Sequence, residues 1–304
     1  MTPPATLLGG DTPRGFVFAL TAYLLWGFLP LYFRLIDHIG MLEVLAHRVV
    51  WSLPIALAVL LALGRTDTLR VALRTPRMLA MGCVTATLIS INWGVYIWAI
   101  HSGQALEAAL GYYINPLFSI FLGAVLLGER LSARQWVAVG LAALAVAVLT
   151  FEAGRLPLAA LTLTVSWGFY AYFKRSLPIG PNQGFALEVI ILMPVALVYL
   201  IWLQSQGTLH FVQAGPRDLA LLVGCGVITA VPLMIYANGA KLLTLSTIAI
   251  MQYIAPTMIF LIAVFLFAEP FGTARAIAFP MIWAALVLYT SEIVGRRLRR
   301  PPIG

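Results

Sequence analysis

Ionisable side chains are rare inside the long apolar stretches of this 304-residue chain. Glu43 and His47 lie one helical turn apart and would share a helix face, with Arg48 beside them. Glu188 lies in another apolar stretch, at the position that matches Arg48 in the repeat described below. Because histidine titrates near neutral pH, His47 could couple a process to protons. The alternative is that His47, Arg48 and Glu188 fix helix ends, with their charged groups reaching an interface.

Aromatic and amide side chains form a second group of candidates, suited to binding rather than to acid–base chemistry. Most lie inside apolar stretches, whereas membrane proteins usually place tryptophan and tyrosine at the interfaces. An aromatic surface with a few hydroxyl and amide groups suits an amphipathic solute, and packing in the core is the alternative for each residue. The candidates are Trp26, Trp93, Tyr96, Tyr112, Asn115, Trp167, Tyr170, Tyr236, Asn238, Gln252 and Tyr253.

Several of these candidates belong to a sequence repeat with an offset of 140 residues. Tyr113-Ile114-Asn115-Pro116 returns as Tyr253-Ile254-Ala255-Pro256, and Trp26-Gly27-Phe28 returns one residue displaced as Trp167-Gly168-Phe169. A proline inside a helix removes a backbone donor and bends the helix. We therefore expect Pro116 and Pro256 to form matched kinks that line or gate a cavity, with a simple packing kink as the alternative.

The elements that position these residues follow from composition. The chain is 62% hydrophobic and 10% charged, whereas about one quarter of the residues in soluble domains are charged. A soluble core of this length could not hide so much apolar surface. Apolar runs of helical spanning length recur along the chain. We expect an all-α membrane protein with spans near 15–34, 43–63, 77–100, 107–127, 132–151, 157–174, 184–204, 217–240, 247–268 and 275–295.

The net charge of +8 is distributed unevenly about these ten spans. Most basic residues lie near the termini and at the ends of the even-numbered spans, for example Arg74, Arg77 and Arg297. The positive-inside rule then places both termini in the cytoplasm. The basic excess is explained by orientation and by anionic lipid headgroups, so no nucleic acid is expected as a partner.

Five spans in each half give the repeat a geometric meaning. An odd number places the second half upside down relative to the first, which is a construction of many secondary transporters. We expect a short cytoplasmic tail over 1–14, one five-helix repeat over 15–151, an inverted repeat over 157–295 and a basic cytoplasmic tail over 296–304. Glu129 and its match Glu269 would then lie on opposite sides of the membrane.

Enzyme chemistry finds little support in the sequence. An intramembrane enzyme would need a nucleophile with its base, paired aspartates or a histidine-rich metal cluster. His47 is the one histidine that lies clearly inside an expected span, and no aspartate lies clearly inside one. The loops are too short for a soluble catalytic domain. No phosphate-binding Gly-x-x-x-x-Gly-Lys motif is present. We expect no catalytic residue, metal, cofactor or nucleotide.

The chain resembles the drug/metabolite transporter superfamily, in the branch of EamA-type ten-helix carriers and, within it, the RarD-like proteins. The stretches that carry the resemblance are Ala22-Tyr23 with Trp26-Gly27, Glu43 with His47-Arg48 and Trp51-Ser52, Ile91-Asn92-Trp93, Glu107 with Leu110-Gly111-Tyr112, and Gln252-Tyr253-Ile254-Ala255-Pro256-Thr257. The likeness covers nearly the whole chain. It implies an exporter of metabolites or drugs in the bacterial inner membrane.

Together these features predict a secondary transporter of small organic solutes such as metabolites, amino acids or drugs. The inverted halves would give alternating access to a central aromatic cavity. The alternative function is a passive channel or a non-transporting accessory protein. The partners expected are a small-molecule substrate and the lipid bilayer. The small residues of spans 5 and 10, such as Gly140 and Ala142, make a homodimer possible.

Overall fold

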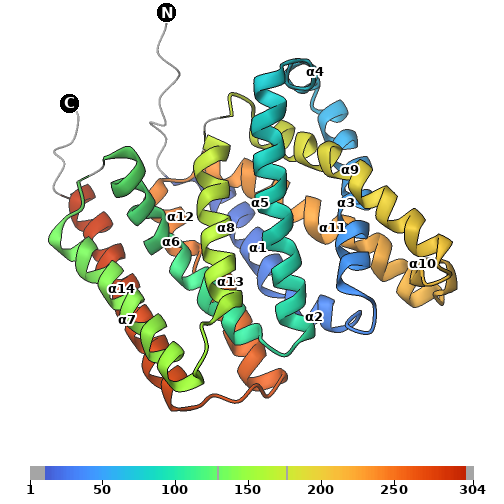
Figure 1. Cartoon of the computed structure of the whole chain (residues 1–304). Helices are drawn as coiled ribbons and strands as arrows, with labels where there is room; N and C mark the ends of the chain where they lie inside the picture. The colour runs from blue at the N-terminus through green and yellow to red at the C-terminus, as the bar shows by residue number, and fades with distance from the viewer. Residues whose placement is uncertain (1–10, 129, 176, 299–304) are drawn as a thin grey trace, which may run out of the picture.

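The computed structural model describes residues 11–128, 130–175 and 177–298, which form helices and turns without a strand (Figure 1). The helices of the first half are α1 (Pro13–Gly27), α2 (Leu29–Arg34), α3 (Met41–Ala62), α4 (Asp67–Arg74), α5 (Pro76–His101), α6 (Ala105–Leu127) and α7 (Ala133–Ala153). Those of the second half are α8 (Leu158–Arg175), α9 (Pro181–Ser205), α10 (His210–Gln213), α11 (Pro216–Gly239), α12 (Leu245–Met251), α13 (Ile254–Leu261) and α14 (Thr273–Leu298). A 3₁₀ turn (Ala240–Leu242) precedes α12, and a π-helical turn (Ile262–Leu266) follows α13.

Local sequence signals set several helix boundaries. The Thr12 side chain accepts a hydrogen bond from the backbone N–H of Gly15 at 3.0 Å, and Pro13 opens α1 where its missing N–H costs nothing. Ser132 and Gln135 form a reciprocal capping box at the start of α7. Gly154 ends the same helix in the left-handed conformation that glycine adopts without strain.

Eight helical segments among the described residues are long and apolar enough to cross a membrane, with α1 and α2 together forming one of them. The expected spans outside this set are α8 and the segment 247–268. α8 has 18 residues and ends in Lys174 and Arg175, and the second segment is divided between α12 and α13. The all-helical membrane fold is confirmed, and the count of ten spans stays a prediction.

Each helix of the first half has a counterpart in the second half, and a pair of helices that packs together corresponds to a pair of counterparts that also packs together. α5 packs on α8, and its counterpart α11 packs on α1. α6 packs on α8, and the counterpart α13 packs on α1. α3 and its counterpart α9 pack on each other, as do α7 and α14, which stand side by side at one edge of Figure 1.

Two matched glycines make corresponding contacts with the other half. A Cβ at Gly27 would meet the side chain of Met258, and a Cβ at Gly168 would meet that of Phe118. Gly27 matches Gly168 in the repeat, and Phe118 matches Met258. Each glycine therefore lets α1 or α8 lie close against the proline-bearing helix of the other half.

The expected placement of Glu129 and Glu269 on opposite sides of the membrane stays a prediction, because Glu129 lies outside the described residues. Residues 1–10 and 299–304 of the expected tails lie outside them as well.

Candidate functional site

A cavity of about 210 Å³ lies among α1, α3, α5, α6, α8, α11 and α13. Both halves contribute to its wall, and most of the aromatic and amide candidates line it. These are Trp26, Trp93, Tyr96, Tyr112, Asn115, Trp167, Tyr236 and Gln252, together with Arg48 and Pro256. The structure thus brings these predicted residues together, while their role in binding stays a prediction.

One wall of the cavity is a cluster of three aromatic rings. Tyr23 meets Trp26 and Tyr236 edge to face, with both ring-centroid distances at 5.6 Å, and Trp26 lies 5.4 Å from Tyr236. Edge-to-face contacts hold each ring in a fixed orientation. Trp26 and Trp167, which match in the repeat, both line the same cavity. The cluster gives the cavity a rigid apolar surface suited to a flat or apolar solute.

A polar bridge between α5 and α8 fixes another part of the cavity wall. The Asn92 amide nitrogen donates to the carbonyl of Leu163 at 3.1 Å and to the Ser166 hydroxyl at 3.0 Å, which joins α5 to α8. The Tyr112 hydroxyl donates to the Asn92 amide oxygen at 3.4 Å. Asn92 therefore positions Tyr112 in the wall, because the amide nitrogen of Asn92 is fixed on α8 and its amide oxygen accepts from Tyr112.

Tyr23 and Asn92 also line the cavity, although neither was among the candidates predicted from the sequence. A usable signal was present for each. Tyr23 precedes Trp26 by three residues, and Asn92 precedes Tyr96 by four, so each shares a helix face with a residue that was chosen.

Tyr170 and Glu188 do not line the cavity but form a buried polar group between α8 and α9. The Tyr170 hydroxyl donates to Glu188 Oε2 at 3.2 Å, and Lys174 Nζ lies 2.5 Å from Glu188 Oε1. The Glu188 side chain is 1% exposed and that of Lys174 is 21% exposed. Glu188 is thus neutralised in place by a neighbouring cation.

Three other predicted residues also lie outside the cavity wall. The Asn238 amide donates to the carbonyl of Met234 at 2.9 Å, so it serves its own helix. Tyr253 packs against the main apolar core. Pro116 lies inside a continuous α6, whereas Pro256 lies in the first turn of α13 after the break at Gln252 and Tyr253. The two matched prolines therefore have different surroundings.

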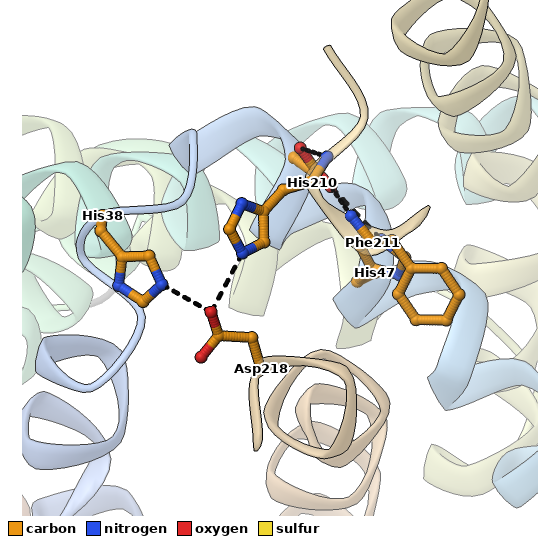
Figure 2. A network of polar contacts seen from close by, with 6 residues as sticks. His38, His47, His210, Phe211 and Asp218 are labelled. Atoms are coloured by element: carbon orange, nitrogen blue, oxygen red, sulfur yellow. Dashed lines mark hydrogen bonds and ion pairs between the residues drawn. The ribbon is translucent and has the colours of Figure 1, made fainter. Parts of the chain in front are cut away.

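His47 also lies outside the cavity wall, in the region where α10 packs beside the α2–α3 loop and α3 (Figure 2). Its Nδ1 accepts a hydrogen bond from Trp51 Nε1 at 3.1 Å, and its ring stacks on Phe211 at 4.7 Å. The Glu43 carboxylate accepts from the backbone N–H groups of His210 and Phe211 at 3.2 and 3.0 Å. Glu43 and His47 therefore anchor α10 on α3, and a role of His47 in proton coupling stays a prediction.

A second polar cluster, which was not predicted from the sequence, lies in the same region. Figure 2 shows the rings of His38 and His210 directed at the same oxygen of Asp218, with Nε2–Oδ2 distances of 2.8 and 3.0 Å. The cluster ties the α2–α3 loop and α10 to the start of α11. Among the described residues, these three side chains form the group of histidine, cysteine and acidic residues that lies close enough together to hold a metal ion, and two hydrogen bonds join them in the structure.

Glu269 joins the two halves near the start of α6. Its carboxylate accepts from the backbone N–H of Ala105 at 2.6 Å and of Leu106 at 3.0 Å. These N–H groups lie in the first turn of α6 and have no acceptor within the helix, and the helix dipole favours a negative group there. Burial raises the pKa of Glu269, and the two N–H donors act in the opposite direction because they bind the ionised form.

We expect Glu269→Ala to lower the free energy of unfolding by about 2 kcal/mol, because two buried N–H donors would lose their acceptor. Glu269→Gln keeps one acceptor oxygen and should cost less. Thermal unfolding in detergent micelles measures both. Equal midpoints for the Ala variant and the unchanged protein would show that the cap contributes nothing.

Comparison with known proteins agrees with this fold. Residues 13–151 match the model of the EamA-like transporter family. An uncharacterized transporter of Vibrio cholerae is 41% identical over 93% of both chains. Protein RarD of Streptomyces exfoliatus is 42% identical over 94% of this chain and 90% of that protein, and Protein RarD of Escherichia coli K12 is 38% identical over 93% and 96%.

A solved crystal structure shares the fold at a TM-score of 0.58, with 23% identity over 94% of this chain and 98% of that chain. This likeness concerns the fold alone, whereas the sequence relatives cover nearly the full length. The described helices, their apolar character and these relatives lead to one assignment. The chain belongs to the EamA-type branch of the drug/metabolite transporter superfamily and is a RarD-like membrane transporter.

Proposed function

We propose that this transporter is a secondary carrier that exports small organic solutes by alternating access through the cavity between its two halves. The observation that carries the proposal is that Trp26 and Trp167, which match in the repeat, line the same cavity. A site built at the interface of inverted halves is accessible from either side when one half rocks against the other. The exchanged helix pairs, such as α5 with α8 and α11 with α1, support that arrangement.

The volume and chemistry of the cavity favour a small solute. About 210 Å³ is below the roughly 300–1,000 Å³ of pockets that hold drug-sized ligands. Its wall combines aromatic rings with amide and hydroxyl groups, which suits a metabolite with an apolar part and a polar end. The distribution of basic residues supports cytoplasmic termini in a bacterial inner membrane.

Counterflow in proteoliposomes tests the proposal. A panel of radiolabelled metabolites is offered to the purified full-length protein, with and without an imposed pH gradient. A carrier should show saturable uptake that is accelerated by unlabelled solute on the other side. Flux that never saturates would indicate a channel, and the absence of counterflow for every solute would contradict the carrier.

We expect Trp26→Ala and Trp167→Ala each to weaken apparent affinity about tenfold, because an aromatic contact contributes about 1–1.5 kcal/mol. Trp202→Ala is the matched control, since Trp202 lies on α9 with its residue 53% exposed. Concentration dependence of counterflow gives the affinity of each variant. If Trp202→Ala weakened the affinity as much as the two cavity variants, the assignment of this cavity as the binding site would be wrong.

A further inference from the structure

Arg48 presents an unusual charge to the cavity. Its residue is 3% exposed, it lines the cavity, and its Nη1 is buried without a hydrogen-bond partner. Its Nε donates to the Thr229 hydroxyl at 3.0 Å, and Thr229 in turn donates to the carbonyl of Cys225 at 2.7 Å. One edge of the guanidinium is therefore anchored, and its terminal nitrogen still lacks an acceptor.

Aromatic rings hold the guanidinium without neutralising it. The Arg48 guanidinium carbon lies 4.6 Å from the ring centroid of Trp93 and 5.2 Å from that of Phe33. Such contacts stabilise a cation by only about 1–2 kcal/mol. An ionised group inside the membrane costs more than this and normally has a charged partner.

The four acidic residues that are buried in the described part of the chain are engaged elsewhere. Glu43 accepts from the start of α10, Glu188 pairs with Lys174, and Glu107 lies 3.6 Å from Arg155. Glu269 accepts from the start of α6. Among the described residues, none of the ion pairs includes Arg48. A negative group that enters the cavity would thus be the missing partner.

We propose that Arg48 binds the carboxylate of the transported solute, so that the carrier selects small organic acids with an apolar body. This inference rests on the proposed carrier function. A guanidinium can form two parallel hydrogen bonds with a carboxylate, and the apolar body would pack against the wall of Trp26 and Tyr236. Arg48 is the basic residue among those that line the cavity, which suits a single negative charge better than a phosphate dianion.

Matched pairs of an acid and its neutral amide test the site directly. We would measure competition of counterflow in proteoliposomes, and binding by tryptophan fluorescence in detergent. The probes are 3-phenylpropionate against 3-phenylpropionamide, octanoate against octanamide, and inorganic phosphate. The unchanged protein should prefer each acid about 10–100-fold, because charge-assisted hydrogen bonds contribute about 1.5–3 kcal/mol. Phosphate should not compete.

Variants separate binding from folding. Arg48→Gln should abolish the preference for acids while it keeps amide binding, and Arg48→Lys should restore part of the preference. Trp26→Ala should weaken acid and amide equally. Because Arg48 lacks a carboxylate partner, Arg48→Gln should leave the thermal midpoint unchanged or raised.

Three results would overturn the assignment. If acids and amides drive saturable counterflow equally well, the proposed carboxylate site is wrong and the carrier function still holds. A retained preference for acids in Arg48→Gln would place the anion elsewhere. A large loss of thermal stability in Arg48→Gln, with acid and amide binding weakened equally, would make Arg48 structural. Absence of counterflow from every probe and metabolite would contradict the carrier itself.

Discussion

Lys174→Met is expected to lower the free energy of unfolding by about 3–5 kcal/mol. The substitution removes the cation that lies 2.5 Å from Glu188 and leaves a carboxylate that is 1% exposed with the Tyr170 hydroxyl as its remaining donor. Removal of one member of a buried ion pair costs this much because the other charge stays buried and uncompensated. Unfolding of the purified protein in mixed micelles by a denaturing detergent gives the difference.

The same pair provides its own controls. Glu188→Leu should cost less than Lys174→Met, because the Lys174 side chain is 21% exposed and can turn toward water. The double variant with Lys174→Met and Glu188→Leu should recover most of the stability, since both charges leave together. Equal losses in the two single variants, or no recovery in the double variant, would contradict a buried ion pair.

Gly226→Leu is expected to cost about 3 kcal/mol or more. A Cβ at Gly226 on α11 would overlap the backbone carbonyl of Trp51 on α3, so the two helices would have to move apart. Overpacking against a backbone cannot be relieved by a side-chain rotation, which places it at the upper end of the usual range. Thermal unfolding in detergent and the yield of monodisperse protein measure the effect.

Gly140→Ala and Gly226→Ala form the matched pair that isolates the effect of one added Cβ. Gly140 lies inside α7, and a Cβ there would have no neighbour within 4 Å. Alanine in a helix is favoured over glycine by about 1 kcal/mol, so this variant should be slightly more stable. If Gly226→Ala and Gly140→Ala shifted the midpoint alike, close approach of α3 and α11 would not explain Gly226.

The helical membrane fold could be predicted because composition and the length of the apolar runs act locally along the chain. The lining of the cavity could be predicted only in part. Trp167 and Tyr170 are both aromatic and share a helix face, yet Trp167 lines the cavity and Tyr170 faces Glu188. Their difference depends on which neighbouring helix covers each depth of α8, and the sequence of α8 alone does not contain that information.

The amides and the loop histidines illustrate the same limit. Asn92 and Asn238 are both polar residues within expected spans, but Asn92 bridges two helices while Asn238 serves its own. His38 and His210 lie far apart in sequence and meet at Asp218 because α10 folds against the α2–α3 loop. Contacts of this kind follow from the topology of the whole chain.

The two matched positions Arg48 and Glu188 bear opposite charges, and this has a consequence for protein engineering. A chain assembled from two copies of the first half would keep the shared tryptophan and proline motifs. It would also lose the pair of Glu188 and Lys174, because both residues belong to the second half, and would bury a second guanidinium at the position of Glu188. An ionised group without a charged partner is costly inside the membrane, so the halves are no longer interchangeable modules. Tandem fusion of the first half would give a chain that needs a compensating change near this position.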